Sequence, residues 1–373
     1  MRAGGEAHDF ERTRGRRGGG PPVRVTVVGA SGNVGTSVLR SLAAEPEVEA
    51  ITGVARRLPR LAVPKTTWVS KDVTGGNLES VFREADAAVI LSWLIQPSRD
   101  LNKLWMTNVE GTMRAVEAAA RSGVKTIAYA SSVGAYSPGP KDRAVDESWP
   151  TGGVAGSHYA LQKAEVERRL DRFEALHPGV RLVRIRPGLV FKREASQGIR
   201  RLFGGPFVPG TLADERLLKL IPEIENLRSQ VIHSYDVGEA FRLALLNDEA
   251  CGAFNIAAEP PLDARAVAGM LGARRFPVPA GAVRAGIDLT WRLRLHPVPA
   301  GWLDLALGVP LMSTVRAREV LGWRPEHSAE ETLREILAGL REGAGLDTPP
   351  LSPDTSGFMR KREILTGIGE REP

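Results

Sequence analysis

The chain has 373 residues, of which 42% are hydrophobic and 25% charged, and its formal net charge is +6, as in an ordinary soluble globular protein. A single cysteine, Cys251, excludes an internal disulfide and a cysteine-based metal site, and no stretch approaches the ~18 uninterrupted apolar residues of a transmembrane helix. The positive charge forms no stripe with interleaved aromatic residues, so we expect no binding of nucleic acid. Taken together, these features predict a cytoplasmic protein that binds no metal and no membrane.

Residues 1–22 are rich in Gly and Arg and carry no apolar period, so we expect a disordered extension there. From Val23 onward, short β-branched runs alternate with stretches of helical apolar spacing. We expect strands at 23–30, 48–55, 66–73, 85–93, 125–132, 180–188 and 252–259. We expect helices at 34–44, 104–123, 157–170, 313–323 and 328–343, and a strand followed by a helix at 231–246.

This alternation predicts an α/β fold. Near-continuous apolar strands separated by helices indicate a parallel sheet that is covered on both faces. We therefore expect a doubly wound parallel Rossmann sheet with a smaller C-terminal substrate-binding lobe. The predicted Rossmann domain is 23–190, with 231–258 returning to it. The predicted lobe comprises 191–230 and 259–345, and 346–373 is the predicted flexible tail.

The stretch "VVGASGNVG" places three glycines at intervals of three, directly after a strand and at the start of a helix. In this context glycine permits a tight turn, and it lets backbone N–H groups and the helix N-terminus approach a pyrophosphate. The alternative is a glycine-rich turn without a ligand. We predict cofactor-binding residues at Gly29, Ser31, Gly32, Asn33, Val34 and Gly35.

The end of the second strand indicates which dinucleotide is bound. An acidic residue at this place would bind a ribose 2′-hydroxyl and repel a 2′-phosphate. Here Ala55 is followed by Arg56 and Arg57, and either guanidinium could hold a phosphate. We therefore favour NADP(H) over NAD(H). The alternative is that both arginines are solvated surface residues.

A tyrosine and a lysine stand four residues apart in "SHYALQKAEVERRL", so the side chains of Tyr159 and Lys163 share one helix face. An ammonium close to a phenol favours the phenolate and makes the tyrosine a usable acid/base. Ser131 and Ser132 end the preceding strand, where a hydroxyl could bind the reacting oxygen. The alternatives are a chance pair and simple capping of the strand end.

Together these stretches resemble the extended short-chain dehydrogenases/reductases, specifically the NAD(P)-dependent epimerase/dehydratase family, from about Val23 to Gly343. The resemblance implies that Ser132 is the catalytic hydroxyl, that Tyr159 is the acid/base, and that Lys163 lowers its pKa and holds the nicotinamide ribose. It also implies cofactor contacts for Asp72 and Val73 beside adenine, Leu91 and Ser92 through backbone, Asn108 near the nicotinamide, and Pro187 and Gly188 beside the carboxamide. The matching stretches are "VTVVGASGNVG", "ADAAVILSW", "NVEGTMRAVEAAARSGVKTIAYASSVGAY", "YALQK", "RIRPGLVF", "VIHSYDVGEAF" and "GAFNIAAE".

The resemblance implies an enzyme that transfers hydride at a hydroxyl or carbonyl carbon. The alternatives are a nucleotide-sugar epimerase that does not consume its cofactor and a non-catalytic NADP(H)-binding sensor. The substrate is expected to be a sugar nucleotide or an apolar alcohol or ketone. Trp291, Leu293 and Trp302 would suit an apolar substrate, but we favour the alternative that they form the packed core of the lobe. The helices at 101–122 and 158–176 are the expected interface of a homodimer.

Overall fold

In the computed structural model, residues 22–95, 98–204, 218–295 and 297–353 are described. The predicted N-terminal extension therefore lies outside the described residues, apart from Pro22. Of the predicted tail, 346–353 are described, and they pack against the body: Thr348 and Leu351 are buried, and Asp347 accepts a backbone hydrogen bond from Arg60.

Seven parallel strands form one sheet in the order β11-β7-β5-β4-β1-β2-β3. The order reverses beside β1, which pairs with both β2 and β4. In such sheets ligands bind beyond the carboxyl ends of the strands at this reversal. The strands are β1 (Val23–Val28), β2 (Val48–Ala55), β3 (Thr66–Ser70), β4 (Ala87–Ile90), β5 (Thr126–Ala130), β7 (Arg181–Pro187) and β11 (Gly252–Ile256).

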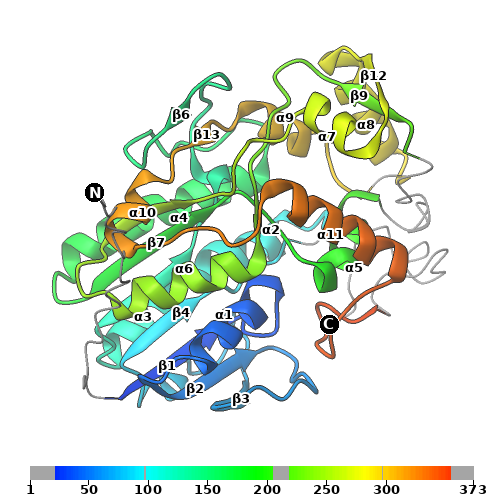
Figure 1. The fold of residues 1–373 in the computed structure, drawn as a ribbon. Helices are drawn as coiled ribbons and strands as arrows, with labels where there is room; N and C mark the ends of the chain where they lie inside the picture. Colours follow the sequence, from blue (N-terminus) through cyan, green and yellow to red (C-terminus); the bar gives the residue numbers. More distant parts are fainter. Residues whose placement is uncertain (1–21, 96–97, 205–217, 296, 354–373) are drawn as a thin grey trace, which may run out of the picture.

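Helices cover both faces of the sheet, as the apolar strands require (Figure 1). On one face α1 (Asn33–Ala43) packs against α6 (Ser234–Leu246) over a core that includes Leu39, Phe241 and Phe254. On the other face α3 (Gly111–Arg121) and α4 (His158–Leu176) enclose Phe82, Leu170 and Phe173. The predicted doubly wound Rossmann fold is confirmed.

The helix expected at 104–123 is interrupted. It consists of α2 (Leu101–Trp105), a π-helical turn η2 (Met106–Glu110), and α3. The chain leaves α3 at Gly123 with a φ of +88°, which glycine adopts without strain. A π turn accommodates one more residue than an α-helical turn, and here it contains Asn108, which is almost fully buried.

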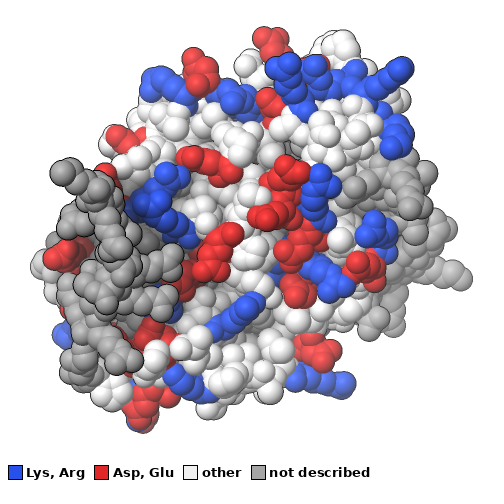
Figure 2. Space-filling view, viewed as in Figure 1, with Lys and Arg blue, Asp and Glu red and all other residues white. Residues whose placement is uncertain are grey.

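The remaining elements form small two-stranded pairs and short helices. Figure 1 shows β9, β12, α7, α8 and α9 gathered at one end of the molecule. No helix among the described residues is long and apolar enough to cross a bilayer, and Figure 2 shows acidic and basic side chains interleaved over the face in view. The paired strands are β6 (Ala144–Val145) with β13 (Leu311–Met312), β8 (Leu189–Phe191) with β10 (Val231–His233), and β9 (Leu220–Glu223) with β12 (Arg274–Pro277). The helices are η1 (Glu79–Val81), η3 (Val133–Ala135), η4 (Arg193–Ala195), α5 (Ser196–Ile199), η5 (Arg200–Gly204), α7 (Ala264–Leu271), α8 (Ala280–Arg292), α9 (Gly301–Gly308), α10 (Val315–Leu321) and α11 (Ala329–Glu342).

Candidate active site

The glycine turn lies between β1 and α1, at the reversal of strand order. Gly29 has a φ of +86°, and a Cβ there would lie 2.8 Å from the backbone nitrogen of Ser92. A Cβ on Gly35 would lie 2.3 Å from the carbonyl oxygen of Gly29. Gly32 is different, because its Cβ would meet nothing closer than 3.4 Å. The packing of the protein itself thus requires Gly29 and Gly35, whereas Gly32 leaves the helix N-terminus open.

The polar atoms around this turn fit a dinucleotide. No side chain caps the N-terminus of α1, so its first N–H groups point at a site suited to an anion. Asn33 donates its amide nitrogen to the carbonyl of Val190, but its Oδ1 is buried and has no partner among the described residues. The same holds for Oγ of Ser92, just after β4. Such buried unpaired atoms are costly without a polar ligand. The other predicted residues of the turn, Ser31 and Val34, are buried and half-buried respectively.

The residues predicted to hold the adenosine half follow β2 and β3. Ala55 is buried, and Arg56 and Arg57 after it are exposed. Burial acts to raise the pKa of the Asp72 carboxyl, but two hydrogen bonds from Thr74 and the positive charges of Arg56 and Arg114 lower it overall. Val73 is buried, and its side chain lies 2.6 Å from where a Cβ on Gly111 would stand.

Ser132 and Tyr159 come together at the carboxyl end of β5. Ser132 is buried, and its Oγ accepts a hydrogen bond from the backbone of Gly134 at 3.0 Å. Burial raises the pKa of Tyr159 to about 12, and a hydrogen bond with Ser132 opposes that rise. The lowered pKa that an acid/base role needs stays a prediction. It requires positive charge beyond what the described residues place on the phenol.

Lys163 is almost fully buried, and its ammonium points back to the strand. Its Nζ donates to the carbonyl of Ala130 at 2.6 Å and to Oη of Tyr129 at 3.2 Å. Burial lowers the pKa of Lys163 well below its usual value, and the carboxylate of Glu167 opposes this shift. Tyr159 and Lys163 do share one face of α4, as the spacing predicts, but no direct contact joins the phenol and the ammonium among the contacts of the described residues.

Trp93 is a site residue that no sequence pattern indicated. Its ring lies over Lys163 with the ammonium 3.5 Å from the ring centroid, a cation–π contact. The same ring meets Tyr159 edge-on, with centroids 5.9 Å apart. Its indole nitrogen is buried without a partner among the described residues. Trp93 therefore fills the space between the two predicted catalytic side chains.

Glu167 was also missed. It lies one helical turn beyond Lys163, is fully buried, and accepts hydrogen bonds from Arg184, Arg186 and Ser131. Burial acts to raise the pKa of this carboxyl, but the two guanidiniums and the serine hold it at about 2. Arg186 also donates to Oη of Tyr136 at 3.0 Å. The continued spacing of four residues on α4 was the signal that could have identified Glu167. By these hydrogen bonds, Glu167 fixes the end of β5, which carries the serines.

Contacts with the backbone position the predicted residues Asn108 and Gly188, and Pro187 precedes Gly188 in the chain. The side-chain amide of Asn108 bonds both the nitrogen and the oxygen of Leu94. Pro187 ends β7. Gly188 donates to the carbonyl of Ile256, and a Cβ on it would lie 2.4 Å from the carbonyl oxygen of Gln230. Gly188 is thus required by this close approach of two chain segments.

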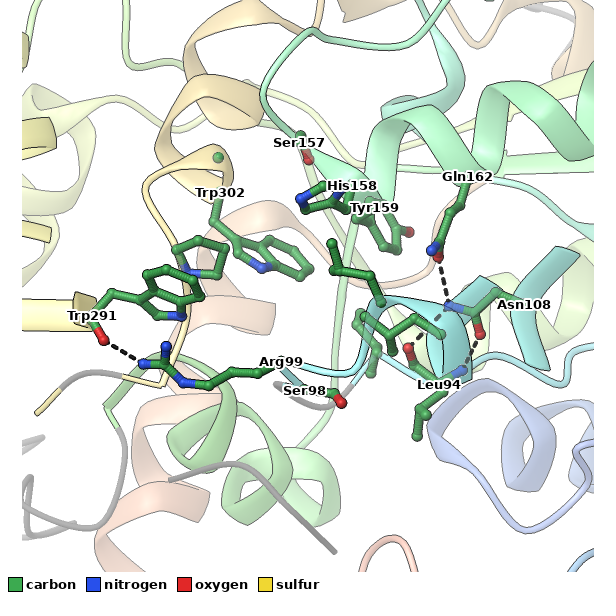
Figure 3. Close-up of a pocket in the computed structure, with 15 residues that line it drawn as sticks. Leu94, Ser98, Arg99, Asn108, Ser157, His158, Tyr159, Gln162, Trp291 and Trp302 are labelled. Atoms are coloured by element: carbon green, nitrogen blue, oxygen red, sulfur yellow. Dashed lines mark hydrogen bonds between the residues drawn. The ribbon is translucent and has the colours of Figure 1, made fainter. Parts of the chain in front are cut away.

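A cavity of about 740 Å³, including its part open to solvent, adjoins Tyr159 (Figure 3). Its walls come from the segment after β4, from α2 and α4, and from α8 and α9. The ring of Trp302 lies 5.2 Å from that of Tyr159. Arg99 stacks on the ring of Trp291 at 4.1 Å and donates to its carbonyl. The lining residues are Leu94, Ile95, Ser98, Arg99, Leu101, Leu104, Asn108, Ser157, His158, Tyr159, Gln162, Trp291, Pro299, Gly301 and Trp302.

Comparison with solved structures supports the fold. MoeE5, solved in complex with UDP-glucose and NAD, superposes with a TM-score of 0.61 at 20% identity, over 86% of this chain and 99% of that one. UDP-glucose 4-epimerase of Thermus thermophilus, in complex with NAD, gives a TM-score of 0.62 at 21% identity, over 85% of this chain and 99% of the epimerase.

Comparison of sequences gives a relative and a family. The uncharacterized protein Rv2047c of Mycobacterium tuberculosis is 24% identical over 87% of this chain, and the chain spans only 31% of that relative's length. A model described as the NAD dependent epimerase/dehydratase family matches residues 25–257. Because this match covers more than half of the chain, the protein belongs to the NAD dependent epimerase/dehydratase family.

Proposed function

We propose that this protein is an NAD(P)-dependent oxidoreductase that transfers hydride at a hydroxyl or carbonyl carbon, with Tyr159 as acid/base. One observation carries the proposal: Tyr159 lies close enough to Ser132, at the carboxyl end of β5, for the serine to lower the pKa of the phenol, and it also lines an open cavity. A substrate oxygen in that cavity can meet both hydroxyls. The open glycine turn lies at the same edge of the sheet, at the reversal of strand order.

The glycine turn would hold a nicotinamide cofactor, which when bound would supply or accept the hydride. When a carbonyl is reduced, Tyr159 donates its proton to the carbonyl oxygen and Ser132 donates a hydrogen bond to the same oxygen. In the reverse direction the phenolate accepts the proton of the substrate hydroxyl. Lys163 lies one turn along α4, but burial lowers the pKa of its ammonium and no direct contact joins it to the phenol among the contacts of the described residues, so the phenolate needs the further positive charge that an oxidised nicotinamide would bring.

The direct test replaces the phenol. Tyr159→Phe removes the proton donor and keeps the ring that packs against Trp302, so we expect turnover to fall by about 10²–10⁴-fold. Tyr235→Phe is the control, because Tyr235 stacks beneath Arg40 on α1, away from the cavity. Activity is measured as carbonyl-dependent oxidation of NADPH or NADH. Unchanged turnover in Tyr159→Phe would remove Tyr159 from the mechanism.

We favour NADP(H) because Arg56 and Arg57 stand where an acid would reject a 2′-phosphate. Neither guanidinium has a carboxylate within 4 Å among the described residues. Replacing both by alanine should weaken NADPH binding about tenfold or more and leave NADH binding unchanged. Calorimetry of wild type and double variant checks this. Tighter binding of NADH by the wild type would overturn the preference, and both solved relatives contain NAD.

A nucleotide-sugar epimerase is the second candidate. MoeE5 was solved with UDP-glucose and the Thermus protein is a UDP-glucose epimerase. Incubation with UDP-sugars, followed by analysis of the sugar, separates the two candidates: an epimer formed without net change in the cofactor favours this one. Tight binding of NADPH without turnover of any carbonyl or sugar would instead indicate a non-catalytic sensor.

We also propose a homodimer through the helices around α2 and α4. Exposed apolar side chains gather there: Leu101, Trp105, Met106, Leu161 and Leu176. Sedimentation should give the mass of two chains, and Met106→Arg combined with Leu161→Arg should give one. Leu58→Arg, an exposed leucine before β3, is the control. A wild type that sediments as a single chain would contradict the proposal.

A further inference from the structure

Gln162 lies on α4 three residues after Tyr159, and its side chain lines the same cavity. Only 5% of the residue is exposed. Buried amides normally satisfy both their oxygen and their nitrogen within the protein. The partners of Gln162 therefore show which group it presents to the cavity.

The orientation of the Gln162 amide follows from Asn108. The backbone nitrogen of Leu94 can only donate and its oxygen can only accept. Asn108 accepts from the first with Oδ1 at 2.6 Å and donates to the second with Nδ2 at 3.2 Å. The second hydrogen on Nδ2 goes to Oε1 of Gln162 at 2.9 Å. Both polar atoms of the Asn108 side-chain amide are thus assigned, and its Nδ2 donor fixes which atom of the Gln162 amide is the oxygen (Figure 3).

The amide nitrogen of Gln162 remains without a partner among the described residues. It is not one of the enclosed unpaired atoms of this region, which include the indole nitrogen of Trp93. Gln162 lines the cavity, and with its oxygen held by Asn108 this nitrogen is the polar atom that its side chain can present there. The site therefore holds an oriented N–H donor on the helix that carries the proposed acid/base.

The rest of the cavity is largely apolar. Leu101 and Leu104 come from α2, Trp291 from α8 and Trp302 from α9. Flat apolar walls favour a flat apolar ligand. Ser98, Arg99, Ser157 and His158 add polar groups to the wall. A donor that is fixed in orientation, as the Gln162 amide is, discriminates strongly, because a ligand without a matching acceptor leaves the donor unpaired.

Building on the oxidoreductase function proposed above, we propose that the substrates are apolar carbonyl compounds that carry a second oxygen besides the reacting one. Nε2 of Gln162 donates to that second oxygen, while Tyr159 and Ser132 meet the reacting one. Vicinal diketones and hydroxyketones with aromatic bodies belong to this class.

Benzil and deoxybenzoin test the assignment, because they share a skeleton and differ in the second carbonyl oxygen. We measure kcat/KM for each with the preferred nicotinamide cofactor in wild type and in Gln162→Glu. The glutamate keeps an oxygen for Asn108 and replaces the cavity-facing donor by an acceptor. The benzil-to-deoxybenzoin ratio of kcat/KM should fall about tenfold or more in the variant, mainly through KM for benzil.

Gln162→Met provides a second comparison, since it removes the donor without adding charge, and it should lower the ratio as well. An unchanged ratio in both variants would overturn the assignment and leave Gln162 as a brace for Asn108. A role as a brace alone would change kcat/KM for both compounds by the same factor and so leave the ratio unchanged.

A binding measurement separates this inference from the oxidoreductase proposal. Quenching of tryptophan fluorescence by benzil and by deoxybenzoin reports affinity without turnover, and it can also be made with Tyr159→Phe. If neither compound is turned over but benzil binds more tightly and loses that preference in Gln162→Glu, the oxidoreductase proposal fails and the donor assignment stands. If benzil does not bind, the substrate class is wrong.

Discussion

The glycine turn and the tyrosine cavity lie at the same edge of one sheet but are built differently. In the turn, neighbouring backbone segments approach so closely that neither Gly29 nor Gly35 has space for a Cβ atom. In the cavity, side chains from α2, α4, α8 and α9 meet, and space remains between them. The first region tolerates few residue types and one ligand geometry. The second can change its ligand by changing side chains, so specificity is expected to reside there.

The largest expected effect tests the rigid side of this comparison. Gly35→Ala would place a Cβ 2.3 Å from the carbonyl of Gly29 and 2.6 Å from that of Ala30, and neither is a flexible side-chain end. We expect a loss of about 4 kcal/mol or more in the free energy of unfolding, with loss of cofactor binding. Urea denaturation and calorimetry measure the two effects. A loss below about 1 kcal/mol would show that the turn is adaptable.

The next effect concerns the ionic cluster beneath the serines. Glu167→Gln leaves Arg186 buried without its carboxylate, while Arg184 keeps Asp171 and Glu174, and we expect a loss of about 3 kcal/mol. Glu330→Gln, which breaks the exposed pair with Arg334, should cost no more than about 0.5 kcal/mol. Equal losses in the free energy of unfolding of the two variants, measured by urea denaturation, would contradict this expectation.

The same carboxyl predicts a dependence on pH. The pKa of Glu167 is about 2 in the folded protein and about 4.3 in an unfolded chain. Its contribution is therefore complete above pH ~4.3 and is lost as the pH falls towards 2, by about 3 kcal/mol in total. Unfolding of the wild type between these pH values should show this loss, and Glu167→Gln should lack that component. A parallel pH dependence in both proteins would remove Glu167 as its source.

A smaller change in stability is expected in the cavity. Trp302 is half-buried and contacts Tyr159 and Phe203 through its ring. Trp302→Leu should change the free energy of unfolding by about 1–2 kcal/mol but weaken benzil binding about tenfold. Fluorescence quenching through the remaining tryptophans measures the affinity. A stability loss as large as that of Gly35→Ala would make Trp302 part of the core instead.

The smallest effect is the matched control for the turn. Gly32→Ala adds a Cβ with nothing closer than 3.4 Å, so the free energy of unfolding should change by less than about 1 kcal/mol. Cofactor affinity should change more than stability, because this Cβ faces the open helix N-terminus. A stability loss equal to that of Gly35→Ala would show that all three glycines serve the fold alone.

The sequence predicts the glycine turn better than it predicts the cavity. The sheet, the turn and the helical face shared by Tyr159 and Lys163 depend on local patterns, which a single chain displays. The contacts of Lys163 with Tyr129 and Ala130, and the cover by Trp93, depend on how distant segments meet. The carboxylate of Glu167 and the amide of Gln162 lie within the helix predicted at 157–170, yet their partners on β7, on η2 and at the end of β5 become visible only in the folded chain.

The π turn at Met106–Glu110 has a consequence for descent within the family. It holds one residue more than a regular helix and thereby directs Asn108 to Leu94 and Gln162. Deleting a single codon there would restore α-helical winding and rotate the following side chains by about 100°. The hydrogen bonds from Asn108 to Leu94, in the segment after β4, would then be lost in one step, without any substitution inside the cavity. Lineages that differ by one such deletion would diverge in ligand choice while keeping the same cofactor turn.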